Sequence, residues 1–196
     1  MAANKVASTN ARASVLFFKF INKPAFVSQQ QYFKQTRTNK IFMAIKANGT
    51  ILISADPETV FAYIANLEND KFWRKEINST TMTSKAQINA LAVEDSYLSK
   101  RTPSNILNLV CIDFLENKRV VYQTIPGSRF FLKSSREVEA ISTNETKVTY
   151  AIEFDKSIVK HGLGFSLPTF LIAFVANRDM KKYLRTLKST MEKAVR

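Results

Sequence analysis

The last thirty residues combine two hydrophobic patterns in one predicted helix, from Ser166 to Val195. Residues 167–176 are apolar on nearly every side, so we expect this half to be enclosed by the rest of the chain. Residues 177–195 are amphipathic, because apolar residues recur at three- and four-residue steps with Lys and Arg between them. The pattern therefore predicts a long terminal helix that covers a surface built by the preceding residues.

The residues before this helix follow a helical pattern at first and an alternating one afterwards. A short strand is predicted at residues 50–54, and Asp56 with Pro57 then supplies the cap and first residue of a helix that continues over 58–67. Residues 71–74 indicate a second short helix or a turn. Alternation then predicts six strands, at residues 77–83, 92–101, 106–115, 119–125, 130–141 and 146–154.

This order of elements predicts an α+β fold in which a curved antiparallel sheet of about seven strands wraps around the long C-terminal helix. Two short helices follow the first strand. A curved sheet and a straight helix do not fill the space between them, so a cavity is expected under the helix. Phe170, Leu171 and Phe174 are predicted to face a ligand there, while Leu184 and Leu187 anchor the second half of the helix as core.

Charge divides the chain into an extension and a domain. The net charge is +13, and residues 1–42 carry seven Lys and Arg but no Asp or Glu. We predict that residues 43–196 form a single ligand-binding domain, and that residues 1–42 are a disordered tail, a targeting segment or the product of a misplaced start site. A cytoplasmic location is expected, with an organelle as the alternative if residues 1–42 are a transit peptide.

The composition argues against several classes of function. Residues 43–196 hold the other 22 Lys and Arg against 16 Asp and Glu, a net charge of only +6, so we expect no nucleic-acid partner. No apolar stretch is long enough to predict a transmembrane helix. The single cysteine, Cys111, and the single histidine, His161, argue against an intrachain disulfide and a structural zinc site, and we predict no metal or other cofactor.

Four segments together resemble one known superfamily. They are ILISADPETVFAYIAN at residues 51–66, LENDKFWRKEI at 67–77, ETKVTYAIEF at 145–154 and YLRTLKSTMEKAV at 183–195. In their order and spacing they resemble the SRPBCC superfamily, which includes START lipid-transfer domains and birch-pollen-allergen-like proteins. They are most similar to its polyketide cyclase/dehydrase-like group. The chain departs from the family pattern at two turns, residues 144–146 and 66–68, where a Gly and an Asp are usual.

The resemblance implies the helix-grip fold and a deep pocket for a hydrophobic or amphipathic molecule. Members of the superfamily carry lipids or hormones, and some are cyclases or dehydratases. We therefore predict that the domain binds a lipid, a polyketide-like compound or an aromatic compound between the sheet and the C-terminal helix. The alternative is a metal-free cyclase or dehydratase that uses polar residues in the same pocket. The sequence leaves the ligand and the oligomeric state open.

Candidate ligand-binding residues come from both predicted layers. Each is a side chain that alternation places on the inner face of a strand, or one that lies close to the predicted pocket. The predicted set is Phe61, Trp73, Tyr122, Arg136, Tyr150, Ile152, Phe154, Phe170, Leu171 and Phe174.

Several of these positions allow two interpretations. Trp73 is placed either against a ligand at the pocket entrance or in the core beneath the short helices. Tyr122 and Tyr150 need a hydrogen-bond partner if buried, which a ligand carbonyl, the protein or water can supply. Arg136 needs an anion from protein or ligand if it faces inward, or a cross-strand carboxylate such as Glu153 if it lies at an edge.

No catalytic residue is assigned. Asp113 is a candidate acid or base only if its side chain points inward, and the alternation favours Ile112 and Phe114 there instead. Cys111 is interpreted as a small buried residue and His161 as a loop residue. The sequence shows no serine–histidine–aspartate, cysteine–histidine, paired-carboxylate or glycine-rich phosphate motif.

The terminal helix also carries a row of cations, Lys181, Arg185 and Lys188. Such a row fits weak contact with an anionic membrane surface or with an acidic partner. An ordinary solvated helix face is the default interpretation of this row.

Overall fold

The computed structural model describes residues 44–194, so the extension predicted at residues 1–42 lies outside the described residues. The strands and helices fall in the predicted order, with one additional helix before the last. In chain order they are β1 (Ala44–Ile53), α3 (Pro57–Ala65), the 3₁₀ helix η1 (Leu67–Phe72), β2 (Ile77–Met82), β3 (Leu91–Ser96), β4 (Asn105–Leu115), β5 (Arg119–Thr124), β6 (Leu132–Ser142), β7 (Glu145–Asp155), α4 (Ser157–Leu163) and α5 (Thr169–Ala194).

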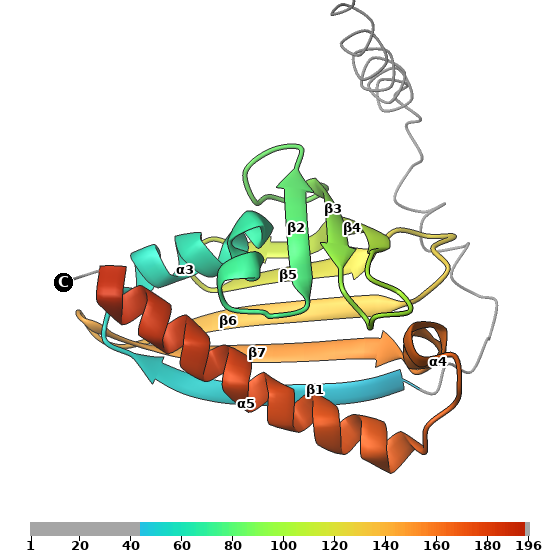
Figure 1. Cartoon of the computed structure of the whole chain (residues 1–196). Helices are drawn as coiled ribbons and strands as arrows, with labels where there is room; N and C mark the ends of the chain where they lie inside the picture. The colour runs from blue at the N-terminus through green and yellow to red at the C-terminus, as the bar shows by residue number, and fades with distance from the viewer. Residues whose placement is uncertain (1–43, 195–196) are drawn as a thin grey trace, which may run out of the picture. The chain divides into compact units, whose positions relative to one another are not determined.

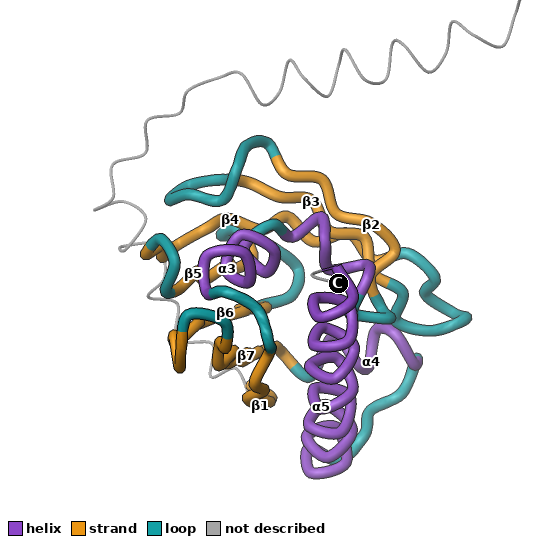
Figure 2. Tube along the Cα trace, turned by 90° about the vertical axis from the view of Figure 1, so that its left-hand side faces the viewer, coloured by secondary structure: helices purple, strands orange, loops and turns teal. Residues whose placement is uncertain are grey.

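The seven strands form one antiparallel sheet in the order β1-β7-β6-β5-β4-β3-β2. Strands β2 to β6 each pair with the next strand along the chain, while β1 pairs with β7. Figures 1 and 2 show the sheet curled around one side of the domain, with α5 lying across its open face. The predicted α+β fold, a curved sheet of about seven strands that wraps around a C-terminal helix, is confirmed.

Capping fixes where the first helix begins. Asp56 accepts a hydrogen bond from the backbone N–H of Thr59 at 2.8 Å, and Pro57 is the first residue of α3. The side-chain oxygen satisfies an N–H that has no partner within the helix, and proline has no N–H to lose at that position. The predicted helix start is confirmed.

The second half of α5 is the main contact between helix and sheet. Met180, Leu184 and Leu187 are buried there, and α5 packs chiefly on β1. A side-chain carbon at Gly49 of β1 would lie only 2.8 Å from Leu184 Cδ1, so the missing side chain lets the helix lie close to the strand. The predicted role of Leu184 and Leu187 as core anchors is confirmed.

The first half of α5 is not enclosed, and this part of the prediction is wrong. Phe170 is 70% exposed and Phe174 is 67% exposed, whereas Ile172 between them is buried. A single helix laid across one sheet is covered on one side only, so an apolar stretch keeps its outer face in solvent. The inward side of this half faces a cavity, which Ile172 helps to line.

Helix α4 occupies residues that the sequence analysis assigned to a loop. Gly162 and Gly164 favoured the loop, but Gly162 lies inside α4, where its lack of a side chain lets the helix pack on Leu98. Gly164 ends the helix in the left-handed conformation, with φ of 86°, and its N–H donates to the carbonyl of Lys160 at 2.8 Å. The two glycines therefore position α4 rather than prevent it.

Candidate ligand-binding site

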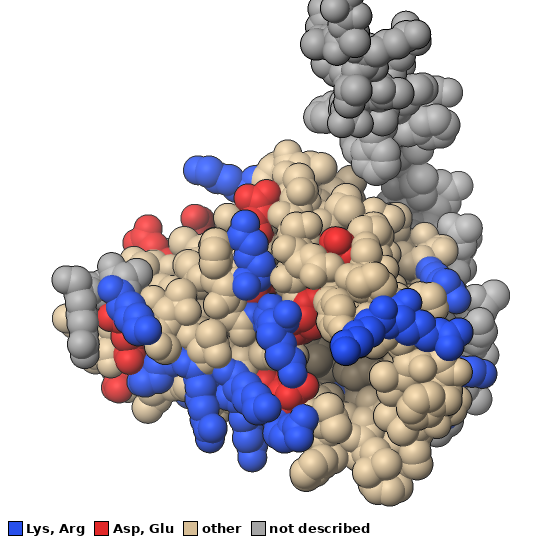
Figure 3. Space-filling view, viewed as in Figure 1, with Lys and Arg blue, Asp and Glu red and all other residues tan. Residues whose placement is uncertain are grey.

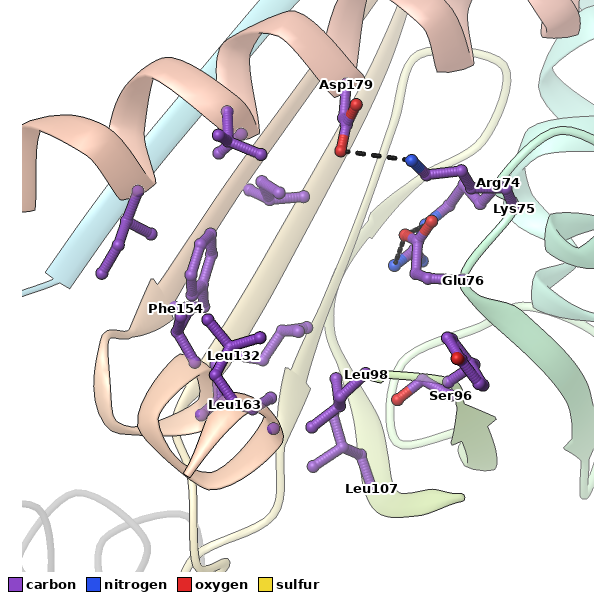
Figure 4. A pocket seen from close by; sticks show the side chains of 18 of the residues that line it. Arg74, Lys75, Glu76, Ser96, Leu98, Leu107, Leu132, Phe154, Leu163 and Asp179 are labelled. Carbon is purple, nitrogen blue, oxygen red and sulfur yellow. Dashed lines mark hydrogen bonds and ion pairs between the residues drawn. The ribbon is translucent and has the colours of Figure 1, made fainter. Parts of the chain in front are cut away.

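A cavity of about 570 Å³ lies between the concave face of the sheet and the first half of α5. Its wall combines strands β3, β4, β6 and β7 with helices α4 and α5 and the segment between η1 and β2. Figure 4 shows the side chains that line it. A cavity of this volume is in the size range of small-molecule binding sites in proteins.

Most of the wall is apolar. Strands, α4 and α5 all contribute aliphatic or aromatic side chains, so the cavity is apolar on opposite sides rather than along one stripe. The apolar wall consists of Leu98, Leu107, Leu132, Ile152, Phe154, Ile158, Val159, Leu163, Leu167, Ile172, Val175 and Ala176. Such a wall favours an apolar ligand, since each Å² removed from water contributes about 25 cal/mol.

Charged residues gather on the other side of the cavity, as Figure 4 shows. The buried Arg74 donates from Nε to Glu76 Oε1 at 2.9 Å and from Nη1 to Glu94 Oε2 at 3.2 Å. Lys75 Nζ lies 3.5 Å from Asp179 Oδ2 of α5. The cavity is therefore amphipathic, with an apolar body and one charged end.

A buried ion-pair network continues behind Arg74 and ties η1 to the sheet. Arg136 of β6 binds Asp70 at both carboxylate oxygens, with Nη1 to Oδ1 at 2.9 Å and Nη2 to Oδ2 at 2.5 Å. Arg74 Nη1 reaches the same Asp70 Oδ2 at 2.9 Å, and Arg136 Nη1 also donates to the carbonyl of Ile64 at 2.6 Å. One fully buried carboxylate thus holds two guanidinium groups in fixed positions.

The charged end presents acceptor atoms to the cavity. Burial raises the pKa of Glu94, and the charge of Arg74 opposes that rise. Glu76 Oε2 and Asp179 Oδ1 are buried, and neither accepts a hydrogen bond within residues 44–194. Burial and then the neighbouring Glu76 raise the pKa of the Tyr183 hydroxyl. These oxygens match a ligand group that donates hydrogen bonds better than an anionic group.

Two aromatic residues lie against the network. The rings of Trp73 and Tyr150 meet edge to face, with centroids 5.2 Å apart and planes at 73°. The Arg136 guanidinium is 5.5 Å from the first ring and 5.6 Å from the second. Neither Trp73 Nε1 nor the Tyr150 hydroxyl has a hydrogen-bond partner in the described part of the chain, and burial raises the pKa of Tyr150.

Comparison with known proteins supports the fold. No protein-family model and no curated protein matches the sequence. Among solved structures, a START superfamily protein from Mycobacterium smegmatis is similar with a TM-score of 0.60 and 12% identity, over 76% of this chain and 98% of that one. Zhui aromatase/cyclase from a Streptomyces species has a TM-score of 0.60 and 13% identity, over 78% and 96%. XoxI from Bacillus cereus has a TM-score of 0.55 and 13% identity, over 77% of this chain and 98% of that one.

The chain has the helix-grip fold of the START superfamily. The resemblance seen in the four sequence segments is therefore confirmed for the fold. Within this fold, the residues predicted to bind a ligand lie in different surroundings.

Two predicted ligand residues line the main cavity of this helix-grip domain. Ile152 and Phe154 face it from β7, as their alternation with Glu153 predicted. Phe61 instead lines a second cavity of about 490 Å³, where its ring lies 5.7 Å from that of Phe114. Trp73, like Phe61, is buried in the core, which is the second of its two interpretations.

Tyr122 and Arg136 are buried and have protein partners. The Tyr122 hydroxyl donates to the carbonyl of Ala65 at 2.9 Å. Arg136 faces inward and pairs with Asp70, whereas the cross-strand Glu153 pairs with Lys46 at 3.8 Å. Neither Tyr122 nor Arg136 lies in the wall of the main cavity, so direct contact of these two residues with a ligand stays a prediction.

The ligand-facing residues predicted on α5 lie next to the cavity rather than in its wall. Phe170, Leu171 and Phe174 are exposed, and the wall is formed by Ile172 and Val175 on the neighbouring side of the helix. This half of α5 does face the cavity, but through Ile172 and Val175 rather than through the predicted side chains. Contact of the exposed three with a ligand stays a prediction.

A β-bulge explains why alternation left Asp113 undecided. The register of β4 against β5 shifts between Cys111 and Asp113, which interrupts the alternation, and Ile112, predicted to face inward, is 39% exposed. Cys111 is buried, and burial raises the pKa of its thiol to about 11. Asp113 is turned to the surface and binds Arg119 Nη2 at 2.7 Å. It therefore gives no support to an acid or base in the cavity.

His161 is the remaining candidate from the sequence, and its surroundings are those of a structural residue. His161 lies in α4 with its ring 5.3 Å from that of Phe130. No group of His, Cys, Asp and Glu within residues 44–194 is placed to hold a metal ion. In the same residues, no helix is both long enough and apolar enough to cross a membrane.

Sequence reasoning missed the charged end of the cavity. Arg74, Glu94 and Asp179 come from three distant segments, and no local pattern joins them. One signal was present, because Glu94 alternates with Ala92 and Ser96 on β3 and all three are buried. An acid on the buried face of a strand indicates a partner or a function.

Proposed function

We propose that the domain binds one hydrophobic or amphipathic small molecule, such as a lipid, a polyketide-like compound or an aromatic compound. The observation that carries this proposal is the cavity of about 570 Å³, with apolar side chains around its body and charges at one end. The helix-grip fold of the solved structures is compatible with such a site. The apolar body of the ligand lies against β7 and α5, and its polar group lies near Arg74.

The side chains at the charged end of the cavity determine which polar group a ligand should carry. Glu76 Oε2 and Asp179 Oδ1 are acceptors without a hydrogen-bond donor in residues 44–194, and the buried Glu94 adds a carboxyl group beside them. A ligand hydroxyl donates to such atoms, whereas a ligand carboxylate is repelled by them. A neutral, hydroxyl-bearing molecule is therefore the expected ligand, in preference to a free fatty acid.

The second candidate is a cyclase or dehydratase, and an aromatase/cyclase is among the similar structures. Its support is Glu94, a buried carboxyl group in the cavity wall whose pKa is raised, which suits a group that transfers protons. Asp113, Tyr122 and Arg136 give it no support, since none of them lines the cavity. An enzyme would change the mass of a bound compound with time, and a binding protein would not.

The test introduces a large side chain into the cavity from α5. Ala176 lines the cavity and Ala173, one turn away on the same helix, does not. We expect Ala176→Trp to lower binding of a neutral apolar dye such as Nile red at least about tenfold, and Ala173→Trp to leave it within about twofold. The measurement is a fluorescence titration, together with native mass spectrometry of compounds that copurify.

Equal binding of the dye by the two variants would show that the dye binds outside this cavity, and it would overturn the proposal. The same titration in competition with a long-chain alcohol and the matching acid tests the polar group. The alcohol should displace the dye at a lower concentration than the acid. The opposite order would show that Arg74, rather than the carboxylates, recognises the ligand.

A further inference from the structure

The outer face of α5 carries two kinds of side chain in sequence along its axis. At about 100° per residue, Phe170, Phe174, Arg178, Lys181 and Arg185 fall within about 80° of one another, on one face about 22 Å long. The first two are exposed aromatic rings and the last three are cations. Figure 3 shows basic side chains gathered over the middle of α5 and an uncharged surface over its first turns.

Acidic side chains are nearly absent from this face. The sequence has no Asp or Glu between Asp155 and Asp179. Asp179 lies on the opposite side of α5, where it lines the cavity. Glu192 lies beyond Arg185, and it already binds Lys188 Nζ at 3.0 Å and the backbone N–H of Ser54 at 2.9 Å. Within residues 44–194, Arg178 Nε lies 3.8 Å from Asp179 Oδ1, whereas Lys181 and Arg185 form no ion pair. The two phenyl rings, Lys181 and Arg185 thus form one surface on which only Arg178 has an acidic neighbour.

We propose that this face, Phe170 to Arg185, docks on a membrane surface that contains anionic phospholipids. The cations match the lipid phosphates in charge, and the two phenyl rings match the depth just below the headgroups, where aromatic and apolar side chains of interfacial helices lie. A rigid acidic protein would satisfy the cations but leave the rings exposed. The lipid surface satisfies both parts of the face.

The position of this face relates docking to the cavity. Val175 lies beside Phe174 on α5 and belongs to the apolar wall, and Leu167 and Leu163 line the cavity just before the helix begins. Docking through the phenyl rings therefore brings the cavity wall close to the lipid layer. The docking surface itself does not rest on the proposed function, because none of its five residues lines the cavity.

The test uses the full chain and sedimentation with vesicles of phosphatidylcholine alone or mixed in equal parts with phosphatidylglycerol. We expect binding to the mixed vesicles only, and at least about tenfold weaker binding for Phe170→Ser/Phe174→Ser and for Lys181→Gln/Arg185→Gln. Binding should also weaken between about 50 and about 500 mM salt. All four residues are exposed, so both variants should keep the wild-type melting temperature.

Phe72→Ser is the matched control, since Phe72 is also an exposed phenyl ring, 57%, and lies on η1. It should bind vesicles as the wild type does. Equal binding by wild type and both double variants would assign the interaction to the basic residues 1–42 and overturn the proposal, as would no binding by the wild type. A wild-type dimer that the phenyl variant dissociates, with vesicle binding unchanged, would assign the face to a second copy instead.

Ala176→Trp separates this proposal from the proposed function. It blocks the cavity and leaves the docking face intact, so it should lower dye binding without changing vesicle binding. Loss of both would show that docking depends on an occupied cavity, and the independent docking surface argued here would be wrong.

Discussion

Helix α5 crosses two regions of one sheet, and the two are filled differently. Under its second half, Leu184 and Leu187 are buried against β1, and Gly49 lets helix and strand approach closely. Under its first half, Ile172 and Val175 face a cavity of about 570 Å³. A straight helix can follow a curled sheet over only part of its length, so contact at one end leaves space at the other. The core serves stability and the cavity is available for a ligand.

The ion-pair network ties η1 to the sheet, and breaking it should have the largest effect. Asp70→Asn leaves Arg74 and Arg136 buried without their shared carboxylate, so we expect a loss of about 3–5 kcal/mol in the free energy of unfolding. Urea unfolding measures it. Asp113→Asn is the control, because its pair with Arg119 is partly exposed and should contribute about 0–1 kcal/mol. A similar small loss for Asp70→Asn would show that the network tolerates one missing charge.

Two substitutions compare the halves of α5 directly, and their effects on stability should be no larger than that of Asp70→Asn. Leu187→Ala removes a fully buried side chain and should cost about 2–5 kcal/mol of unfolding free energy. Phe174→Ala removes an exposed ring and should change it by no more than about 0.5 kcal/mol. The sequence pattern predicts in addition that Phe174→Ala alters ligand uptake more than Leu187→Ala. A larger loss of unfolding free energy for Phe174→Ala than for Leu187→Ala would mean that the first half of α5, and not the second, stabilises the fold.

The smallest effect concerns the pH dependence of stability at the charged end of the cavity. Because burial raises the pKa of Glu94 in the folded state, its contribution to stability is complete below about pH 4.5 and falls as the pH rises through the folded pKa. Glu94→Gln should therefore flatten the decline of unfolding free energy with pH above that point.

Urea titrations from about pH 4.5 to about pH 8 measure this slope. Glu192 is not its source, because its pKa is lowered to about 2, chiefly by the Ser54 N–H, and it stays ionised throughout. Glu153→Gln, a change at a partly exposed strand position, serves as the control and should keep the wild-type slope. A wild-type slope in Glu94→Gln would contradict a raised pKa of the buried Glu94 carboxyl group.

The sequence was informative where physical causes are local. Asp56 and Pro57 marked a helix start, and alternation placed Ile152 and Phe154 on the inner face of β7. Local patterns were insufficient where partners are remote: Asp70 and Arg136 are 66 residues apart, and nothing near either residue indicates the other. The β4 bulge also breaks the alternation from which facing was inferred. Apolar content alone did not reveal that Phe170 remains in solvent.

The pairing of the first strand with the last has a consequence for how the chain folds. The hydrogen bond from Thr146 Oγ1 to the carbonyl of Ala55 spans 91 residues, and the one from the Ser54 N–H to Glu192 spans 138. Contacts so distant in sequence form slowly, because a long loop must close before they contribute. During synthesis, β2 to β6 can each pair with the next strand as it emerges. Strand β1 must wait for β7, so the edge that supports α5 is assembled last.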